Sequence, residues 1–207
     1  MQLYETATAP NPRRVRMFLA EKGLLDEVER IEIDLQRGDN LTPEFTEKNP
    51  FRKVPVLELA DGTTIAETLA ICRYFEAAYP ASPALLGTDA RSIAQIEQWL
   101  RWLEFYFMLP VGMCFQHTSG YFKDRMNPIP EWGEDCHRQA GHFYDFLEQH
   151  LGQTGQPYLC GDSITAADIS AFCTLAFARV VKLRIQPEQP HLAQWYARMS
   201  ERESAQV

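Results

Sequence analysis

Apolar and polar residues follow two different periodicities along the chain, and the change from one to the other divides it into two parts. In the first part, short alternating runs predict four strands, at residues 1–5, 28–35, 54–59 and 63–65. Apolar residues three to four positions apart predict helices at residues 12–22 and 66–79. Residues 38–49 between them are polar and irregular, and we expect one short helix there, around residues 43–48. This mixture of strands and helices predicts an α/β fold for the first part.

From Thr88 onward only the helical periodicity remains. It predicts four helices, around residues 93–107, 132–151, 165–183 and 191–202, and we expect Pro110 to kink the continuation of the first. Residues 80–87, PASPALLG, have the composition of a linker. We therefore predict two domains, an α/β domain of residues 1–80 and an all-helical domain of residues 88–207.

Composition and charge exclude several classes of function. The 207 residues carry 20 Lys and Arg against 28 Asp and Glu, a net charge of −8, which disfavours a protein that grips nucleic acid. No apolar run reaches the roughly 18 residues of a membrane span, and the first residues lack the pattern of a secretory signal. The five cysteines are odd in number and widely spaced, unlike a disulfide framework or a zinc site. We expect a cytoplasmic protein with no nucleic-acid or membrane partner.

Two short motifs in the α/β part could recognise a peptide-like ligand. Lys53-Val54-Pro55 opens the third strand, where a proline indicates an edge position, a cis peptide bond or an ordinary strand entry. A Val54 with outward N–H and C=O groups would pair with an extended peptide as an added strand does. Glu67-Thr68 opens the next helix, where first-turn amides and the Thr68 hydroxyl would bind a carboxylate, and Glu67 an amino group. A plain helix cap is the alternative.

Two further segments lie at predicted helix starts. Thr165 and Asp168 fit the S/T-x-x-D pattern of a capping box, which predicts a structural role for Asp168. The loop at residues 6–16, TATAPNPRRVR, leads from the first strand into the first helix. A thiolate placed at that helix N-terminus would be stabilised by the helix dipole.

Together these segments resemble the glutathione transferase superfamily, and the resemblance covers nearly the whole chain. It is carried by the thioredoxin-like order of elements, by Val54-Pro55, by Glu67-Thr68 and by GDSITAADI at residues 161–169. The resemblance implies a thioredoxin-like glutathione-binding domain, a helical domain that holds a hydrophobic co-substrate, and a homodimer. It also implies that Glu67 and Thr68 hold the γ-glutamyl end of glutathione. Val54 would pair with the cysteinyl backbone, and Lys53 would face the glycine carboxylate.

The resemblance to the superfamily is weakest at the residue that would bind the glutathione sulfur. Members of the superfamily place a tyrosine, serine or cysteine in the first loop, whereas here the cysteine position falls near Ala9. Thr8 and Asn11 are the candidate donors to a thiolate in this loop, and we expect Tyr4 to pack within the strand.

The chain looks most like an atypical fungal and bacterial branch of the superfamily. In that branch a serine and a histidine on the first long helix of the second domain position a water near the sulfur. Here Gly112 stands at the serine position and Gln116 at the histidine position, with His117 one place later. His117 is therefore the third catalytic candidate, and a surface or helix-end histidine is the alternative.

We predict an enzyme that conjugates glutathione, as a co-substrate, to small hydrophobic electrophiles without a cofactor or metal. The alternatives are a non-catalytic glutathione-binding or stress-response module of the same fold, and a glutathione-dependent peroxidase or disulfide reductase. The side chains expected to hold the electrophile are Tyr106, Phe107, Met113 and Phe115.

Overall fold

The computed structural model describes residues 1–207 and divides into two compact units. The first comprises Met1–Leu85 and Glu203–Val207, and the second comprises Leu86–Arg202. The last residues of the chain belong to the first unit because they bind its first helix: Arg13 Nη2 donates to the Ala205 carbonyl at 2.8 Å. None of the helices has the length and apolar content that crossing a lipid bilayer requires.

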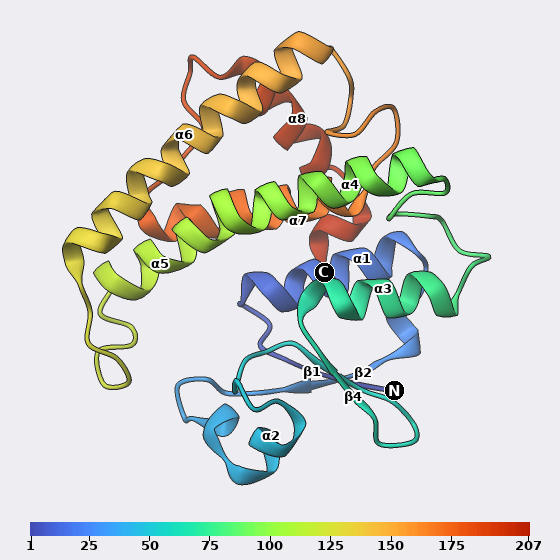
Figure 1. The fold of residues 1–207 in the computed structure, drawn as a ribbon, viewed down its shortest axis with the longest axis vertical. Helices are drawn as coiled ribbons and strands as arrows, with labels where there is room; N and C mark the ends of the chain where they lie inside the picture. The colour runs from blue at the N-terminus through green and yellow to red at the C-terminus, as the bar shows by residue number, and fades with distance from the viewer. The chain divides into compact units, whose positions relative to one another are not determined.

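The first unit is built on a four-stranded sheet with strand order β2-β1-β3-β4 (Figure 1). Its strands and helices are β1 (Gln2–Glu5), α1 (Pro10–Glu21), β2 (Glu29–Glu32), α2 (Pro43–Lys48), β3 (Val56–Glu58), β4 (Thr64–Ala66) and α3 (Thr68–Ala78). β1 pairs with β2 in parallel, and β3 pairs with both β1 and β4 in antiparallel fashion. This mixed sheet confirms the predicted thioredoxin-like unit.

Successive side chains along each strand point to opposite faces of the sheet, and each face is covered by different helices. Val56 packs with Phe45 of α2, so this face is covered by α2. Leu3 and Leu57 are fully buried. Leu57 follows Val56 in β3 and pairs with Leu3, so both point to the opposite face, where Figure 1 shows α1 and α3 side by side. α1 and α3 therefore lie over one face of the sheet and α2 over the other.

The boundaries of some elements differ from the prediction. β2 spans Glu29–Glu32 only, shorter than the predicted run, because its register with β1 ends at Glu5. α3 begins at Thr68 rather than Ala66, since Ala66 still pairs with Val56 in the β3–β4 hairpin. The edge interpretation of Pro55 is wrong, because β3 lies between two neighbouring strands.

The second unit is all-helical, as predicted. Its elements are α4 (Ala90–Leu103), the π-helical turn η3 (Glu104–Met108), α5 (Leu109–Thr118), α6 (Pro130–Thr154), α7 (Ala166–Ala178) and α8 (Pro190–Ser200). The predicted break of the first long helix occurs one turn before Pro110, at η3. Pro110 has no N–H to donate to the Tyr106 carbonyl, and its ring crowds that carbonyl. The helix therefore widens into a π turn just before the proline.

The capping segment has the structural role that the sequence predicts. Asp168 is fully buried and accepts hydrogen bonds from the amides of Thr165 at 2.9 Å and Leu159 at 2.8 Å. The indole of Trp195 on α8 donates to the same carboxylate at 3.1 Å. Asp168 therefore ties the start of α7 to the preceding loop and to α8.

Candidate functional site

Val54 lies just beyond the paired end of the β3–β4 hairpin. In that hairpin Val56 pairs with Ala66, so the same register brings Val54 and Thr68 to one end. The Val54 side chain is buried against Val56 and Phe45, and the Val54–Pro55 peptide bond is cis. The N–H and C=O of Val54 make no hydrogen bond within the protein. A residue anchored by its side chain, with both backbone groups unpaired, can pair with an extended peptide.

The start of α3 carries a second set of unpaired groups at the same end of the hairpin. Glu67 precedes the helix with φ 70° and ψ 126°, a conformation that costs a non-glycine residue about 1–3 kcal/mol. Its side chain does not cap the helix, and the Thr68 hydroxyl has no partner in the protein, so a plain cap is not what forms here. The first helical bond of α3 is donated by Ile71 to the Glu67 carbonyl, which leaves the amides of the first turn available to an anion.

Two buried asparagines hold the loop that leads to Val54. Asn49 Nδ2 donates to the Lys53 carbonyl at 2.9 Å, and its Oδ1 accepts from the Phe51 amide at 3.0 Å. Asn40 Nδ2 donates to the Arg52 carbonyl at 2.8 Å. The Lys53 side chain is exposed and makes no ion pair within the protein. The sequence analysis did not single out these asparagines, although the Asn-Pro pair at residues 49–50 is a signal for a turn.

The first loop forms a tight turn directly before α1. The Ala9 amide donates to the Thr6 carbonyl at 3.0 Å, and the exposed Thr8 has no hydrogen-bond partner. Asn11 lies in the first helical turn, where its Oδ1 accepts from Arg14 at 2.9 Å. Since the carbonyl oxygen of this side-chain amide is engaged, its Nδ2 group is the part left to donate to a ligand.

Two prolines reduce the number of amides at the start of α1. Pro10 and Pro12 have no N–H, and the Arg13 amide donates to the Ala9 carbonyl at 3.3 Å. The Asn11 amide is therefore the one free N–H of the first turn. Asn11 thus offers both a backbone and a side-chain donor.

Tyr4 is a packing residue rather than part of the loop. Its ring lies edge-on to Phe45 at 6.3 Å between centroids, and its hydroxyl donates to Glu58 at 2.8 Å. Burial, followed by the hydrogen bond to Glu58, raises the pKa of the Tyr4 hydroxyl.

The cysteines have the properties of packing residues. None of the five forms a disulfide bond, and burial raises the pKa of Cys72 and of Cys160 to about 12. A thiol with such a pKa is protonated near neutral pH and is a poor nucleophile. No group of three or more His, Cys, Asp or Glu side chains has the arrangement of a metal site.

His117 lies at the end of α5 in the second unit, and one of its ring nitrogens is already engaged. Its Nδ1 accepts from the Ile129 amide at 2.9 Å. A neutral imidazole that accepts at Nδ1 carries its proton on Nε2, so the group available to a ligand is an N–H donor. On the same helix, a Cβ added to Gly112 would meet no heavy atom within 4 Å, so packing does not require glycine at this position.

The four residues predicted to hold the electrophile separate into different environments of the second unit. Phe115 of α5 forms ring contacts with Tyr121, Phe122 and Phe177, at 5.4, 6.1 and 5.5 Å between centroids. Met113 is partly buried on the same helix. The sequence analysis did not identify Tyr121, Phe122 or Phe177, because they come from two other segments and no periodicity links them to Phe115.

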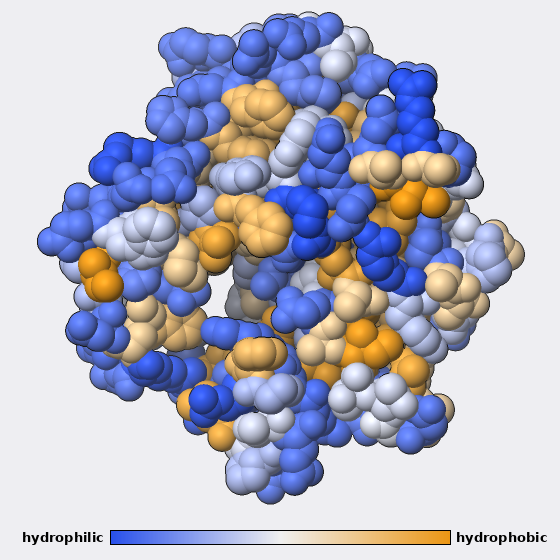
Figure 2. All heavy atoms as spheres, in the orientation of Figure 1, coloured by the Kyte–Doolittle hydropathy of each residue, from blue (hydrophilic) through white to orange (hydrophobic).

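Tyr106 and Phe107 do not join this cluster. Tyr106 is exposed and lines a cavity of about 280 Å³ with Gln139, His142, Phe143 and Phe146 of α6. Figure 2 shows hydrophobic side chains at the surface between α4 and α6. Phe107 is fully buried and stacks on Phe143 at 5.0 Å, so its ring belongs to the core of the second unit. The expectation that Phe107 contacts a small molecule is corrected accordingly.

Known proteins share both the sequence and the fold of this chain. Residues 8–78 match the family described as glutathione S-transferase, N-terminal domain, and residues 130–198 match glutathione S-transferase, C-terminal domain. The chain is 37% identical to glutathione S-transferase 2 of Saccharomyces cerevisiae over 206 residues, which are 99% of this chain and 87% of the relative. The chain belongs to the glutathione S-transferase family.

Solved structures of glutathione S-transferases confirm the predicted fold and family. The crystal structure of Gtt2 from Saccharomyces cerevisiae has a TM-score of 0.93 and covers 100% of this chain and 99% of that one, at 37% identity. A glutathione S-transferase of class Gtt2 from Vibrio parahaemolyticus has a TM-score of 0.83 at 33% identity and covers 100% of this chain and 96% of that one.

Proposed function

We propose that the protein is a glutathione transferase that binds glutathione on its first unit and transfers the thiol to a small hydrophobic electrophile. The observation that carries the proposal is the end of the β3–β4 hairpin, where the unpaired backbone of Val54 and the open start of α3 occur together. Glutathione is a short peptide with two carboxylates and one amino group, so it needs both a strand-like partner and anion sites.

Each part of glutathione has a proposed partner. Val54 pairs with the cysteinyl backbone, and the Thr68 hydroxyl with the first amides of α3 binds the γ-glutamyl carboxylate. The Glu67 carboxylate accepts a hydrogen bond from the γ-glutamyl amino group. The strained backbone at Glu67 supports this assignment, because such strain is commonly found at binding sites. Lys53 faces the glycine carboxylate. These interactions bind glutathione but leave its thiol to be activated by other groups.

Thiol activation is assigned to Thr8 of the first loop and to Asn11 in the first turn of α1, with His117 as a further candidate donor. A free cysteine-type thiol has a pKa of about 8.5, and lowering it by two units requires about 2.7 kcal/mol of preference for the thiolate. A hydrogen bond to a charged group contributes about 1.5–3 kcal/mol, and a helix N-terminus about 0.3–1 kcal/mol. Asn11 can supply a side-chain and a backbone donor at the start of α1, which together with the dipole is enough.

The electrophile is assigned to the second unit. Phe115, with the aromatic residues around it, forms its proposed apolar surface, and Met113 of the same helix is a further candidate. Tyr106 is a separate candidate, since its neighbours come from α6. We also propose that the protein is a homodimer in the cytoplasm. Five cysteines without a disulfide bond support a reducing compartment, and the exposed aromatic residues between α4 and α6 support association of two copies.

Retention on immobilised glutathione, followed by a conjugation assay with an aryl halide, tests the function. A transferase is eluted by free glutathione and forms the thioether. The absence of tyrosine, serine and cysteine from residues 6–11 favours one alternative, a non-catalytic glutathione-binding module. Tight retention without thioether formation would establish that alternative instead, and turnover of peroxide by the retained protein would establish a peroxidase.

A further inference from the structure

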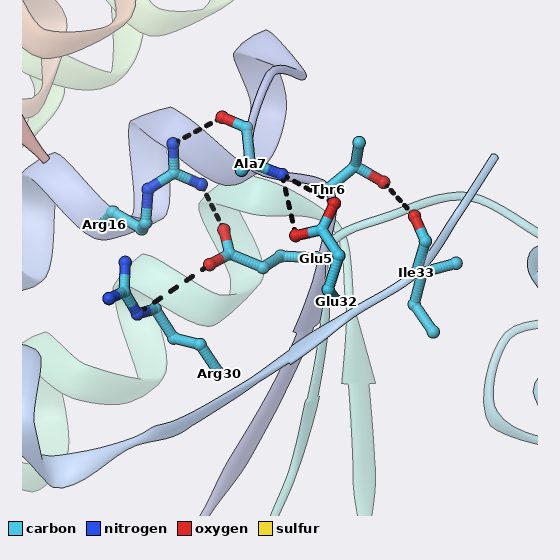
Figure 3. Close-up of polar contacts among 7 residues, drawn as sticks. All are labelled: Glu5, Thr6, Ala7, Arg16, Arg30, Glu32 and Ile33. Carbon is cyan, nitrogen blue, oxygen red and sulfur yellow. Dashed lines mark hydrogen bonds and ion pairs between the residues drawn. The ribbon is translucent and has the colours of Figure 1, made fainter. Parts of the chain in front are cut away.

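The backbone on both sides of Ala7 is held by charged side chains from two different elements (Figure 3). Arg16 of α1 donates from Nη2 to the Ala7 carbonyl at 2.8 Å. Both carboxylate oxygens of Glu32, at the end of β2, accept from the Ala7 N–H, at 3.2 and 3.1 Å. Neither residue was assigned to the site by the sequence analysis, because a charged residue on an exposed strand or an amphipathic helix usually faces solvent.

Arg16 is itself fixed before it reaches Ala7. Its side chain is 4% exposed and forms an ion pair with Glu5, whose side chain is equally buried. Arg30 approaches the other oxygen of Glu5 at 4.0 Å from β2. A guanidinium that binds a buried carboxylate and a carbonyl at the same time has little freedom to rotate, so the position of the Ala7 carbonyl is well defined.

The start of the turn is also attached to β2. The Ile33 amide donates to the Glu5 carbonyl at 2.7 Å, and the Thr6 hydroxyl donates to the Ile33 carbonyl at 2.6 Å. Residues 5–7 therefore cannot shift relative to β2 without breaking three separate contacts, and cannot shift relative to α1 without breaking the Arg16 bond.

The orientation of the Ala7 carbonyl determines that of the Thr8 N–H. The two groups belong to one trans peptide, in which C=O and N–H point in opposite directions. Because the carbonyl points to the buried Arg16, the Thr8 N–H points away from it. That N–H has no acceptor within the protein, and Thr8 is exposed. The clamp thus presents a free backbone donor immediately before α1.

We propose that Arg16 and Glu32 are positioning residues of the transferase reaction, which fix the Thr6–Ala9 turn so that the Thr8 backbone N–H donates to the glutathione thiolate. The assignment rests on the proposed function. A backbone donor of this kind explains how a first loop without tyrosine, serine or cysteine can still lower the pKa of a bound thiol.

Glu32 is the better residue to test, because it is exposed and its replacement removes no buried charge partner. In Glu32→Ala we expect the pKa of the bound glutathione thiol to rise by about 0.5 unit and kcat near pH 6.5 to fall about threefold. The thiolate absorbance of the binary complex, followed against pH, reports the pKa directly. Affinity for S-methylglutathione, which has no thiol to ionise, should change less than twofold.

The matched variants separate positioning from general damage. Glu32→Gln keeps an oxygen acceptor for the Ala7 N–H and should restore most of the thiol pKa. Glu29→Ala removes another exposed glutamate of β2, whose side chain binds only Gln2, and should leave the thiol pKa unchanged. Arg16→Lys, which cannot bind Glu5 and Ala7 bidentately, should raise the thiol pKa more than Glu32→Ala if its melting temperature shows that it folds.

Hydrogen exchange of the Ala7 amide without glutathione tests the clamp independently of the reaction. Faster exchange in Glu32→Ala together with the raised thiol pKa supports the proposal. Unchanged exchange, or an unchanged thiol pKa in Glu32→Ala, overturns it. A native protein that neither binds nor conjugates glutathione overturns the proposed function and the positioning role with it, while the exchange result still reports whether Glu32 holds the turn.

Discussion

The two helices that cover one face of the sheet begin in opposite ways. α3 begins with an open first turn, where the amides after Glu67 are free, Glu67 is strained, and neither Glu67 nor Thr68 uses its side chain within the protein. α1 begins with two prolines, which remove two amides, and follows a turn that Arg16 and Glu32 hold in place.

This difference matches the two tasks that a glutathione transferase must perform. Binding a carboxylate is served by several donors that are free until the ligand arrives, as at α3. Stabilising a thiolate is served by few donors in fixed directions, because a preorganised donor needs no rearrangement when the charge develops. If glutathione binds as proposed, we expect the start of α3 to determine its affinity and the start of α1 to determine the pKa of its thiol.

Removal of the Thr68 hydroxyl should have the largest effect on binding. Thr68→Ala takes one hydrogen bond from a charged carboxylate, a loss of about 1.5–3 kcal/mol, so the KM for glutathione should rise roughly 10- to 100-fold. kcat at saturating glutathione and the pKa of the bound thiol should stay close to the native values. Steady-state kinetics with glutathione as the varied substrate provide the measurement.

Thr63→Ala is the matched control, since Thr63 lies at the other end of the same hairpin and beside Asp61. Its KM should equal that of the native protein. A fall in kcat with an unchanged KM in Thr68→Ala would contradict the division of roles between α3 and α1.

Loss of the Asn11 side chain should affect the thiol rather than binding. Asn11→Ala should raise the thiol pKa by about 0.5–1 unit and lower kcat roughly 3- to 10-fold below that pKa, because one donor to the thiolate is lost. Asn11→Asp should raise the pKa further, since it replaces a donor by a negative charge. The pH dependence of kcat/KM with an aryl halide gives these values.

Thr8→Ala is the companion to Asn11→Ala. It removes the hydroxyl but keeps the backbone N–H, so we expect less than about a threefold loss of kcat. A larger loss than in Asn11→Ala would make the Thr8 hydroxyl, rather than Asn11 and the backbone, the principal donor.

The same two helix starts show how far the sequence alone could lead. Glu67-Thr68 and Val54-Pro55 could be singled out because each is a short motif at the start of a helix or a strand, although each is a weak signal alone and its role came from the family resemblance. Arg16 and Glu32 were missed because their partner is the backbone near Ala7, and a backbone group has no signature in the sequence. Their contact depends on how β2 and α1 pack on β1.

For secondary structure, too, local signals could be predicted and effects of packing could not. The short helix expected around residues 43–48 lies at Pro43–Lys48, where a proline in the first turn suits a helix start. The break of the first long helix was expected at Pro110 and lies one turn earlier, because a proline leaves the carbonyl four residues before it without a donor. Phe107 was assigned to the electrophile because periodicity identifies apolar residues without distinguishing core from cavity.

Restoring an amide at the start of α1 would make the first turn of this helix more like that of α3. Pro10→Ala adds an N–H at the first helical position, where φ is already helical, so little change in stability is expected. If the sulfur lies near this helix end, the thiol pKa should fall by about 0.2–0.5 unit through one more oriented dipole. Thiolate absorbance against pH measures the shift, and a raised pKa would show that the proline ring, rather than the missing amide, matters at this position.

Glu58→Gln should have the smallest effect and serves as the control for both helix starts. Glu58 lies on β3, pairs with Lys48 and accepts from the Tyr4 hydroxyl, and these two contacts lower the pKa of its carboxyl. A carboxyl whose pKa is lower in the folded state contributes stability above its unfolded-state pKa and loses it as pH falls through the folded value. Near neutral pH the variant should therefore unfold with a free energy less than about 1 kcal/mol below the native one, and the difference should vanish in strong acid. Urea unfolding at several pH values measures this. Glu58 touches neither helix start, so the Glu58→Gln variant should keep the native KM for glutathione and the native pKa of the bound thiol. A shift in either value would mean that changes in the sheet reach the helix starts, and that the differences between α1 and α3 are not set by local groups alone.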